Sequence, residues 1–129
     1  MSIRVLLIDD SSLVRKVMKK TLSMTGLPVD AVFEAGNGVE GLDVLQKEWV
    51  DIIFLDINMP VMNGVTFMEH VQQDPSYSKT PVIVISTEGS DDRKEQLKQL
   101  GIKAYLRKPA TPEAISETVT KLLGELHGN

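Results

Sequence analysis

Three short runs of apolar residues constrain the fold of this chain more than any other feature. They lie at residues 5–8 (VLLI), 52–55 (IIFL) and 82–85 (VIVI). None shows the alternation of apolar and polar residues expected of a strand with one face in water. Short continuous apolar runs rich in β-branched residues are typical of strands buried on both faces. We therefore expect these runs to form the centre of a parallel sheet that is covered by helices.

Two weaker strands and five helices complete the pattern. Residues 31–35 (AVFEA) and 104–106 (AYL) contain polar or small members and suggest edge strands. Helical periodicity predicts helices over about residues 13–22, 38–45, 64–73, 90–100 and 112–126. In the first helix the residues expected to face the core are Leu13, Val14, Val17, Met18 and Leu22. The opposite, solvated side would carry Arg15, Lys16, Lys19 and Lys20.

Strand and helix alternate five times along the chain. With short loops, this alternation implies right-handed crossovers between parallel strands and a three-layer, doubly wound α/β sandwich. The five units use nearly all of the 129 residues. We therefore expect a single domain over residues 1–129, without an attached output domain.

Composition excludes several classes of function. Lys and Arg number 14 against 18 Asp and Glu, a formal net charge of −4, which argues against partners that are nucleic acids or anionic membranes. The absence of cysteine excludes disulfide scaffolds, thiolate zinc sites and cysteine nucleophiles. The apolar runs are too short to span a bilayer, and residues 1–4 lead directly into a strand. We therefore expect no signal peptide and a cytoplasmic location.

Polar residues follow the ends of the predicted strands. They are Asp9 and Asp10 after the first strand, Asp56 after the third, Ser86 after the fourth and Lys108 after the fifth. Each alone is explained by a helix cap, a turn or a solvated surface position. However, in a sheet of this kind ligands bind beyond the carboxyl ends of the strands. The sequence therefore predicts a site at this edge of the sheet.

The residue types at this edge favour phosphoryl chemistry. Neighbouring carboxylates repel one another, which raises a pKa or requires a cation. Oxygen ligands without His or Cys suit a hard cation such as Mg²⁺. A lysine beside them can hold a phosphoryl oxygen. Carboxylate nucleophile, metal, hydroxyl and lysine are together the parts that a phosphoryl transfer needs.

At this point the chain resembles the response-regulator receiver domains of two-component signalling, most closely the stand-alone chemotaxis (CheY-like) type. The motifs that carry the resemblance are the Asp9-Asp10 pair, Asp56 followed by residues 59–64 (MPVMNG), Ser86, and the Lys108-Pro109 pair. The likeness covers essentially the whole chain. It implies a flavodoxin-like fold, with five parallel strands in the order 2-1-3-4-5 and five helices.

The resemblance also implies roles for individual residues. Asp56 would be the phosphoacceptor, assisted by Lys108 and Ser86. Mg²⁺ would be held by Asp10 and Asp56 directly, by Asp9 through water, and by the backbone carbonyl of Asn58. Ser86 and Tyr105 would form the switch, with Ser86 bonding the phosphoryl group and Tyr105 turning inward. A cis bond would precede Pro109, and Glu88 would tune dephosphorylation.

The expected partners follow from the same likeness. A histidine kinase would be the phosphodonor, and a downstream protein would bind the face formed by helix 4, strand 5 and helix 5. A phosphatase is an additional expected partner, whereas nucleic acid and membrane are not. Regulators that bind the flagellar motor tend to carry lysines on this face. Here residues 89–92 read GSDD, although Lys121 is retained, so a motor target is in doubt.

Other functions remain open on the sequence alone. The chain would not be an enzyme in the ordinary sense, because the phosphorylation and dephosphorylation of Asp56 are self-catalysed. An aspartate-based phosphatase needs a second Asp two residues after the nucleophile, where this chain has Asn58. A flavodoxin-like electron carrier would not place Asp9 and Asp10 at its phosphate loop. Within the family, an intermediate phosphorelay carrier and a receiver-like scaffold without phosphorylation are the alternatives.

Overall fold

A computed structural model describes residues 2–87 and 89–126 of the chain. In this part of the chain a single parallel sheet has the strand order β2-β1-β3-β4-β5. The strands are β1 (Ile3–Ile8), β2 (Val29–Ala35), β3 (Ile52–Leu55), β4 (Val82–Ser86) and β5 (Ala104–Arg107). The order predicted from the resemblance is confirmed, and the two strands predicted to be edges, β2 and β5, are the edges.

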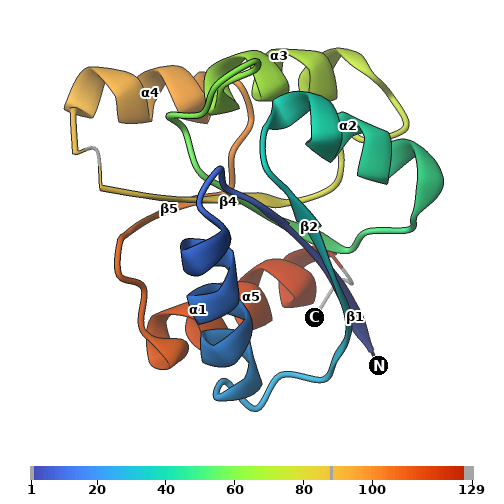
Figure 1. Cartoon of the computed structure of the whole chain (residues 1–129), viewed down its shortest axis with the longest axis vertical. Coiled ribbons are helices and arrows are strands. Elements are labelled where there is room, and N and C mark those ends of the chain that lie inside the picture. Colours follow the sequence, from blue (N-terminus) through green and yellow to red (C-terminus); the bar gives the residue numbers. More distant parts are fainter. Residues whose placement is uncertain (1, 88, 127–129) are drawn as a thin grey trace.

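Helices cover both faces of the sheet, as Figure 1 shows. They are α1 (Ser12–Ser23), α2 (Gly38–Lys47), α3 (Gly64–Gln73), α4 (Asp91–Gln99) and α5 (Pro112–Leu126). In the figure α2, α3 and α4 lie on one side of the strands, and α1 and α5 lie on the other. The predicted three-layer sandwich is therefore confirmed. Within residues 2–87 and 89–126, every helix is too short or too polar to cross a membrane.

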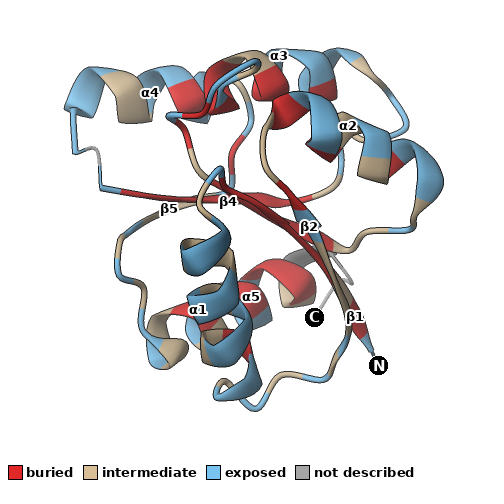
Figure 2. Cartoon of the chain, viewed as in Figure 1, coloured by how far each residue is buried: buried red, intermediate tan, exposed pale blue. Residues whose placement is uncertain are grey.

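The apolar runs are continuous because both faces of the central strands are buried. Successive side chains of a strand point to opposite faces. In β1, Leu6 and Ile8 join the core under α2, α3 and α4, whereas Val5 and Leu7 join the core under α1 and α5. All four side chains are at most 2% exposed. Figure 2 shows the central strands as buried along most of their length.

Each helix starts with a polar side chain that accepts a hydrogen bond from its first turn. These N-cap contacts fix how the chain leaves the strand end and enters the helix. They are made by Ser11 to Val14 N (3.2 Å), Asn37 to Glu40 N (3.0 Å), Asn63 to Thr66 N (3.0 Å), Ser90 to Arg93 N (3.2 Å) and Thr111 to Ala114 N (3.1 Å). These contacts therefore fix the residue at which each helix begins after its strand.

The predicted core face of α1 was partly wrong. Leu13 and Val17 are 69% and 54% exposed. The inward stripe is Val14, Met18 and Leu22, which recur every four residues. Residues 13 and 17 are rotated about 100° from that stripe. Because α1 packs beside α5 at the edge of its layer, it buries only this narrow stripe, and Figure 2 shows most of α1 as exposed.

Gly64 allows α3 to begin directly against the end of β3. A Cβ atom at this position would lie 2.6 Å from the carbonyl oxygen of Asp56 and 2.9 Å from the Cα atom of Ile57. The Gly64 amide donates a hydrogen bond to the Ile57 carbonyl at 2.8 Å. Since the obstructing atoms are backbone, they cannot turn aside as a flexible side chain would. Glycine at this position therefore lets the loop after Asp56 close tightly.

We predict that Gly64→Ala destabilises the fold by about 1–3 kcal/mol, the usual cost of overpacking a site that cannot relax. Urea unfolding monitored by circular dichroism measures the change. Gly124→Ala is the matched control, because a Cβ at Gly124 meets no atom within 4 Å. That change in α5 should leave stability equal or raise it by up to about 1 kcal/mol. Equal stability of Gly64→Ala and the wild type would contradict the tight contact.

Candidate functional site

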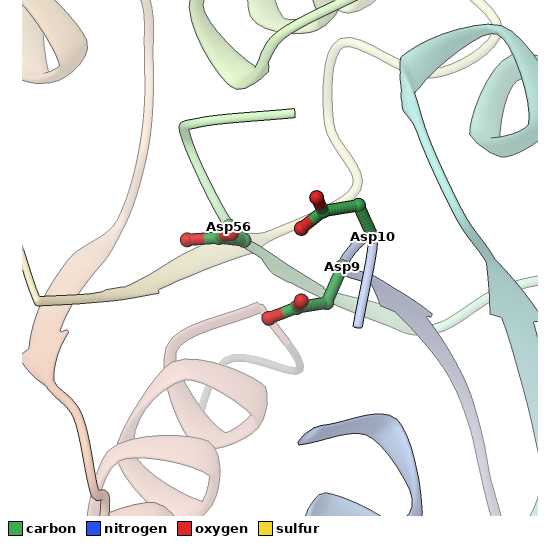
Figure 3. A group of neighbouring side chains, drawn as sticks. All are labelled: Asp9, Asp10 and Asp56. Carbon is green, nitrogen blue, oxygen red and sulfur yellow. The ribbon is translucent and has the colours of Figure 1, made fainter. Parts of the chain in front are cut away.

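Three aspartates meet where the adjacent strands β1 and β3 end. Asp9 and Asp10 follow β1, and Asp56 follows β3, with its amide bonded to the Ile8 carbonyl at 2.9 Å. One carboxylate oxygen from each aspartate lies within 4.8 Å of the other two. Figure 3 shows the three side chains grouped at the two strand ends. Asp9 is buried and Asp10 is exposed, so the group opens to solvent on one side.

Lys108 brings a positive charge into this acidic group. Its Nζ atom lies 2.7 Å from Asp9 Oδ2 and 3.4 Å from Asp56 Oδ1. Its backbone amide donates a hydrogen bond to the Ser86 carbonyl at 3.0 Å, which ties the end of β5 to the end of β4. The Lys108-Pro109 bond is cis, as the resemblance implied. Two of the three carboxylates, those of Asp9 and Asp56, therefore share one ammonium group.

Burial and neighbouring charges shift the pKa values of Asp56 and Lys108. Burial raises the pKa of Asp56, and the charge of Asp9 raises it further, while Lys108 offsets only part of the rise. Burial alone would lower the pKa of Lys108. Its hydrogen bond to Asp9 and the charge of Asp56 outweigh burial, so the pKa of Lys108 is raised. Lys108 is therefore positive at neutral pH, whereas an ionised Asp56 is electrostatically unfavourable in the free protein.

The donor set suits a hard divalent cation. The grouped side chains are all carboxylates, and oxygen ligands are those that Mg²⁺ and Ca²⁺ prefer. Asp9 is already engaged on both oxygens, because Oδ1 accepts from the Ser11 amide at 2.9 Å and Oδ2 accepts from Lys108. Asp10 is exposed and faces solvent. The residues present thus fit a cation at this edge.

Of the remaining residues named from the sequence, Ser86 and Asn58 lie at or near the same edge. Ser86 ends β4, is 1% exposed and is paired with Arg107 in the sheet. Asn58 is exposed and lies two residues after Asp56. Tyr105 lies apart from the acidic group, on β5 opposite Val84. Glu88, expected to tune dephosphorylation, lies outside the described residues.

Arg15 is a neighbour of the site that the sequence assigned to the solvated side of its helix. Its Nη1 atom donates a hydrogen bond to the Asp9 carbonyl at 2.6 Å, and its Nε atom donates to Glu34 Oε1 at 3.0 Å. The sequence does hold a signal for this placement. Arg15 directly follows Val14, the first residue of the inward stripe of α1, and so stands at the border of the buried face.

Comparisons with known proteins agree with the fold. The family model described as "Response regulator receiver domain" matches residues 5–120. A chemotaxis protein CheY homolog of Campylobacter jejuni is 37% identical over 122 residues, covering 94% of this chain and 92% of the relative. Chemotaxis protein CheY1 of Helicobacter pylori is 34% identical over 122 residues, covering 94% and 97%.

A solved structure gives the same result at the level of the fold. The chemotaxis protein CheY4 of Vibrio cholerae superimposes with a TM-score of 0.83 and 34% sequence identity, covering 95% of this chain and 99% of that chain. Motifs, strand order and relatives thus agree over nearly the whole length. The chain belongs to the response regulator receiver domain family.

Proposed function

We propose that this protein is a stand-alone response regulator, which accepts a phosphoryl group from a histidine kinase on Asp56 and then binds a protein partner of a chemotaxis pathway more tightly. The observation that carries the proposal is the position of Asp56. Its carboxylate lies 3.4 Å from Lys108 Nζ and within 4.8 Å of oxygens from Asp9 and Asp10. The chemotaxis assignment draws on the CheY relatives, and a cytoplasmic location is proposed on the same ground.

In the proposed transfer, Asp56 acts as the nucleophile and Lys108 compensates the added charge. A carboxylate oxygen of Asp56 attacks the phosphorus atom of the phosphohistidine, and the phosphorus–nitrogen bond breaks as the imidazole leaves. The group adds about −1.5 to −2 charges at neutral pH, together with three acceptor oxygens. Lys108 already spans Asp9 and Asp56, so its ammonium is placed to pair with one of those oxygens. No separate enzyme is needed, because the chain supplies both the nucleophile and the charge compensation.

Asp10, Asp56 and the backbone carbonyl of Asn58 would hold Mg²⁺, and Asp9 would contribute through water. The indirect role of Asp9 is supported by its two existing hydrogen bonds, to the Ser11 amide and to Lys108. When bound, the ion neutralises charge on the phosphoryl oxygens. Asp10 is exposed, so the ion can enter from solvent without opening the fold.

Ser86 and Tyr105 would convert phosphorylation into a change at the binding face. Ser86 ends β4, next to the strand that bears Lys108, and its hydroxyl would move onto the phosphoryl group. Tyr105 lines a groove of about 410 Å³ between α4 and β5, and Lys94 Nζ lies 5.1 Å from the centre of its ring. When Ser86 moves, the loop before α4 follows it and leaves room for the Tyr105 ring. Rotation of the Tyr105 ring would change the shape of the groove that it lines.

The lining of this groove indicates the chemistry of the target. Besides Tyr105 it includes three lysines, Lys94, Lys98 and Lys103, against two carboxylates, Asp91 and Glu95, so the lysines are in excess by one. Lys121 lines a second hollow, between β5 and α5. We therefore propose a target segment with carboxylates for the lysines and an apolar residue for the tyrosine ring. The acidic start of α4, at Asp91 and Asp92, distinguishes this face from that of regulators that bind the flagellar motor.

We predict that acetyl phosphate with Mg²⁺ phosphorylates the wild type, and that Asp56→Asn reduces labelling to background because the amide cannot act as the nucleophile. Intact-protein mass spectrometry measures the added phosphoryl group. EDTA should abolish labelling of the wild type. Asp43→Asn, the same chemical change at an exposed aspartate paired with Lys47, should label normally. Equal labelling of Asp56→Asn and the wild type would disprove the proposal and favour the scaffold without phosphorylation.

We predict that Asp56→Asn melts at a higher temperature than the wild type in EDTA at pH 7. The pKa of Asp56 is raised on folding, so its ionised form costs stability above that pKa and costs none below the unfolded value of 3.8. The advantage of the variant should therefore shrink as the pH falls toward 4. Mg²⁺ should stabilise the wild type more than the variant. Calorimetry over this pH range measures both effects, and a lower melting point for the variant in EDTA would contradict the assignment.

We predict that Tyr105→Ala separates phosphorylation from output. Labelling by acetyl phosphate should be unchanged, because Tyr105 lies apart from the acidic group. The gain in target binding on phosphorylation should fall about tenfold, a loss of about 1.4 kcal/mol. Pulldown from cell extract with and without phosphodonor, quantified by mass spectrometry, measures this gain. Lys121→Glu should instead weaken binding in both states.

The same pulldown separates an output regulator from a relay carrier. An intact gain in Tyr105→Ala would show that Tyr105 is not part of the switch. A relay carrier would instead pass the label on to a histidine of another protein.

A further inference from the structure

Arg15 connects the acidic site to the edge strand β2. Its guanidinium donates to the Asp9 carbonyl at 2.6 Å through Nη1 and to Glu34 Oε1 at 3.0 Å through Nε. The Arg15 side chain is only 18% exposed, so little of it moves freely in solvent. One side chain of α1 therefore bridges the end of β1 and the neighbouring strand.

Glu34 holds the guanidinium in this orientation. It lies on β2 opposite Leu7 of β1, one strand away from the acidic group. Its other carboxylate oxygen pairs with Lys19 at 3.2 Å. The hydrogen bond from Arg15 is the main cause that lowers the pKa of Glu34, and Lys19 adds to it. Glu34 is consequently ionised at neutral pH and forms a fixed anchor for Arg15.

Arg15 binds the Asp9 carbonyl, which directly precedes Asp10 in the chain. The Asp9 amide is fixed by the Ala35 carbonyl at 3.0 Å, and its side chain is fixed by the Ser11 amide and by Lys108. The carbonyl belongs to the rigid peptide unit that joins Asp9 to Asp10. A contact that holds this oxygen therefore also sets the direction in which the chain continues to Asp10.

We infer that Arg15 is a positioning residue for the metal site, which sets the affinity for Mg²⁺ by holding the Asp9–Asp10 peptide unit. The inference rests on the proposed function, because it takes the acidic group to be the Mg²⁺ site. A carboxylate that is already ordered loses less conformational freedom when the ion binds. Arg15 acts through the two aspartates.

The contact needs an arginine in particular. The planar guanidinium donates along separate directions, so it can bond the Asp9 carbonyl and the Glu34 carboxylate together. A lysine offers a single charged nitrogen at the end of a flexible stem. Arg15→Lys would keep the charge but lose one of the two bonds. Lys19 supplies a matched control, because it pairs with the other carboxylate oxygen of Glu34, Oε2, and its bond is to Glu34 and not to Asp9.

The test measures Mg²⁺ binding to the unphosphorylated protein by calorimetry. We expect Arg15→Met to weaken Mg²⁺ binding about tenfold or more, since loss of groups that orient metal ligands usually costs 10–100-fold. Arg15→Lys should not restore the affinity, and Lys19→Met should stay within about twofold of the wild type. Labelling by acetyl phosphate should slow at low Mg²⁺ in Arg15→Met and recover at saturating Mg²⁺. Urea unfolding in EDTA verifies that each variant is folded.

The outcomes separate this inference from the proposed function. If the wild type neither binds Mg²⁺ nor accepts a phosphoryl group, the proposed function fails. If the wild type does both and Arg15→Met binds Mg²⁺ equally well, only the positioning role is wrong. Should Arg15→Met not fold, Glu34→Gln replaces it, because it keeps Arg15 but weakens its anchor. A loss of Mg²⁺ affinity of about threefold in Glu34→Gln then supports the role, and unchanged affinity overturns it.

Discussion

The close approach of three carboxylates at the ends of β1 and β3 is the constraint on which the rest of the structure depends. Burial is the main cause that raises the pKa of Asp56, and the charge of the neighbouring Asp9 raises it further. The fold holds them together with backbone hydrogen bonds, such as that from the Asp56 amide to Ile8, and with the charge of Lys108. The free protein thus keeps electrostatic energy that a bound cation can relieve.

The parallel sheet makes this arrangement possible. A strand that is buried on both faces carries apolar side chains along its length. Its polar side chains therefore occur where the strand ends. Tight contacts then fix the loops, as where Gly64 lies against the Asp56 carbonyl. Lys108 is bonded through its backbone to Ser86, so under the proposed function phosphorylation of Asp56 would act along β4 and β5 toward Tyr105.

Much of the fold and the acidic group could be predicted from the sequence, for physical reasons. Continuous apolar runs specify buried strands, and residues after parallel strands must meet at one edge, so Asp9 and Asp56 were placed correctly. The outward position of Leu13 and Val17 was not predicted. Periodicity shows that a helix has an apolar side, but it does not show how much of that side the neighbouring elements cover. Arg15 was missed because its position next to Val14 shows only that it borders the buried face of the helix, not which carbonyl it contacts.

The most direct test of this account locates the phosphoryl group chemically. An aspartyl phosphate is an acyl phosphate, which borohydride reduces to homoserine, whereas phosphohistidine and phosphoserine are not reduced in this way. After labelling with acetyl phosphate and Mg²⁺, reduction and peptide mass spectrometry should place homoserine at position 56. Homoserine at position 9 or 10, or a label that resists reduction, would contradict the claim that the electrostatics of this site make Asp56 the acceptor.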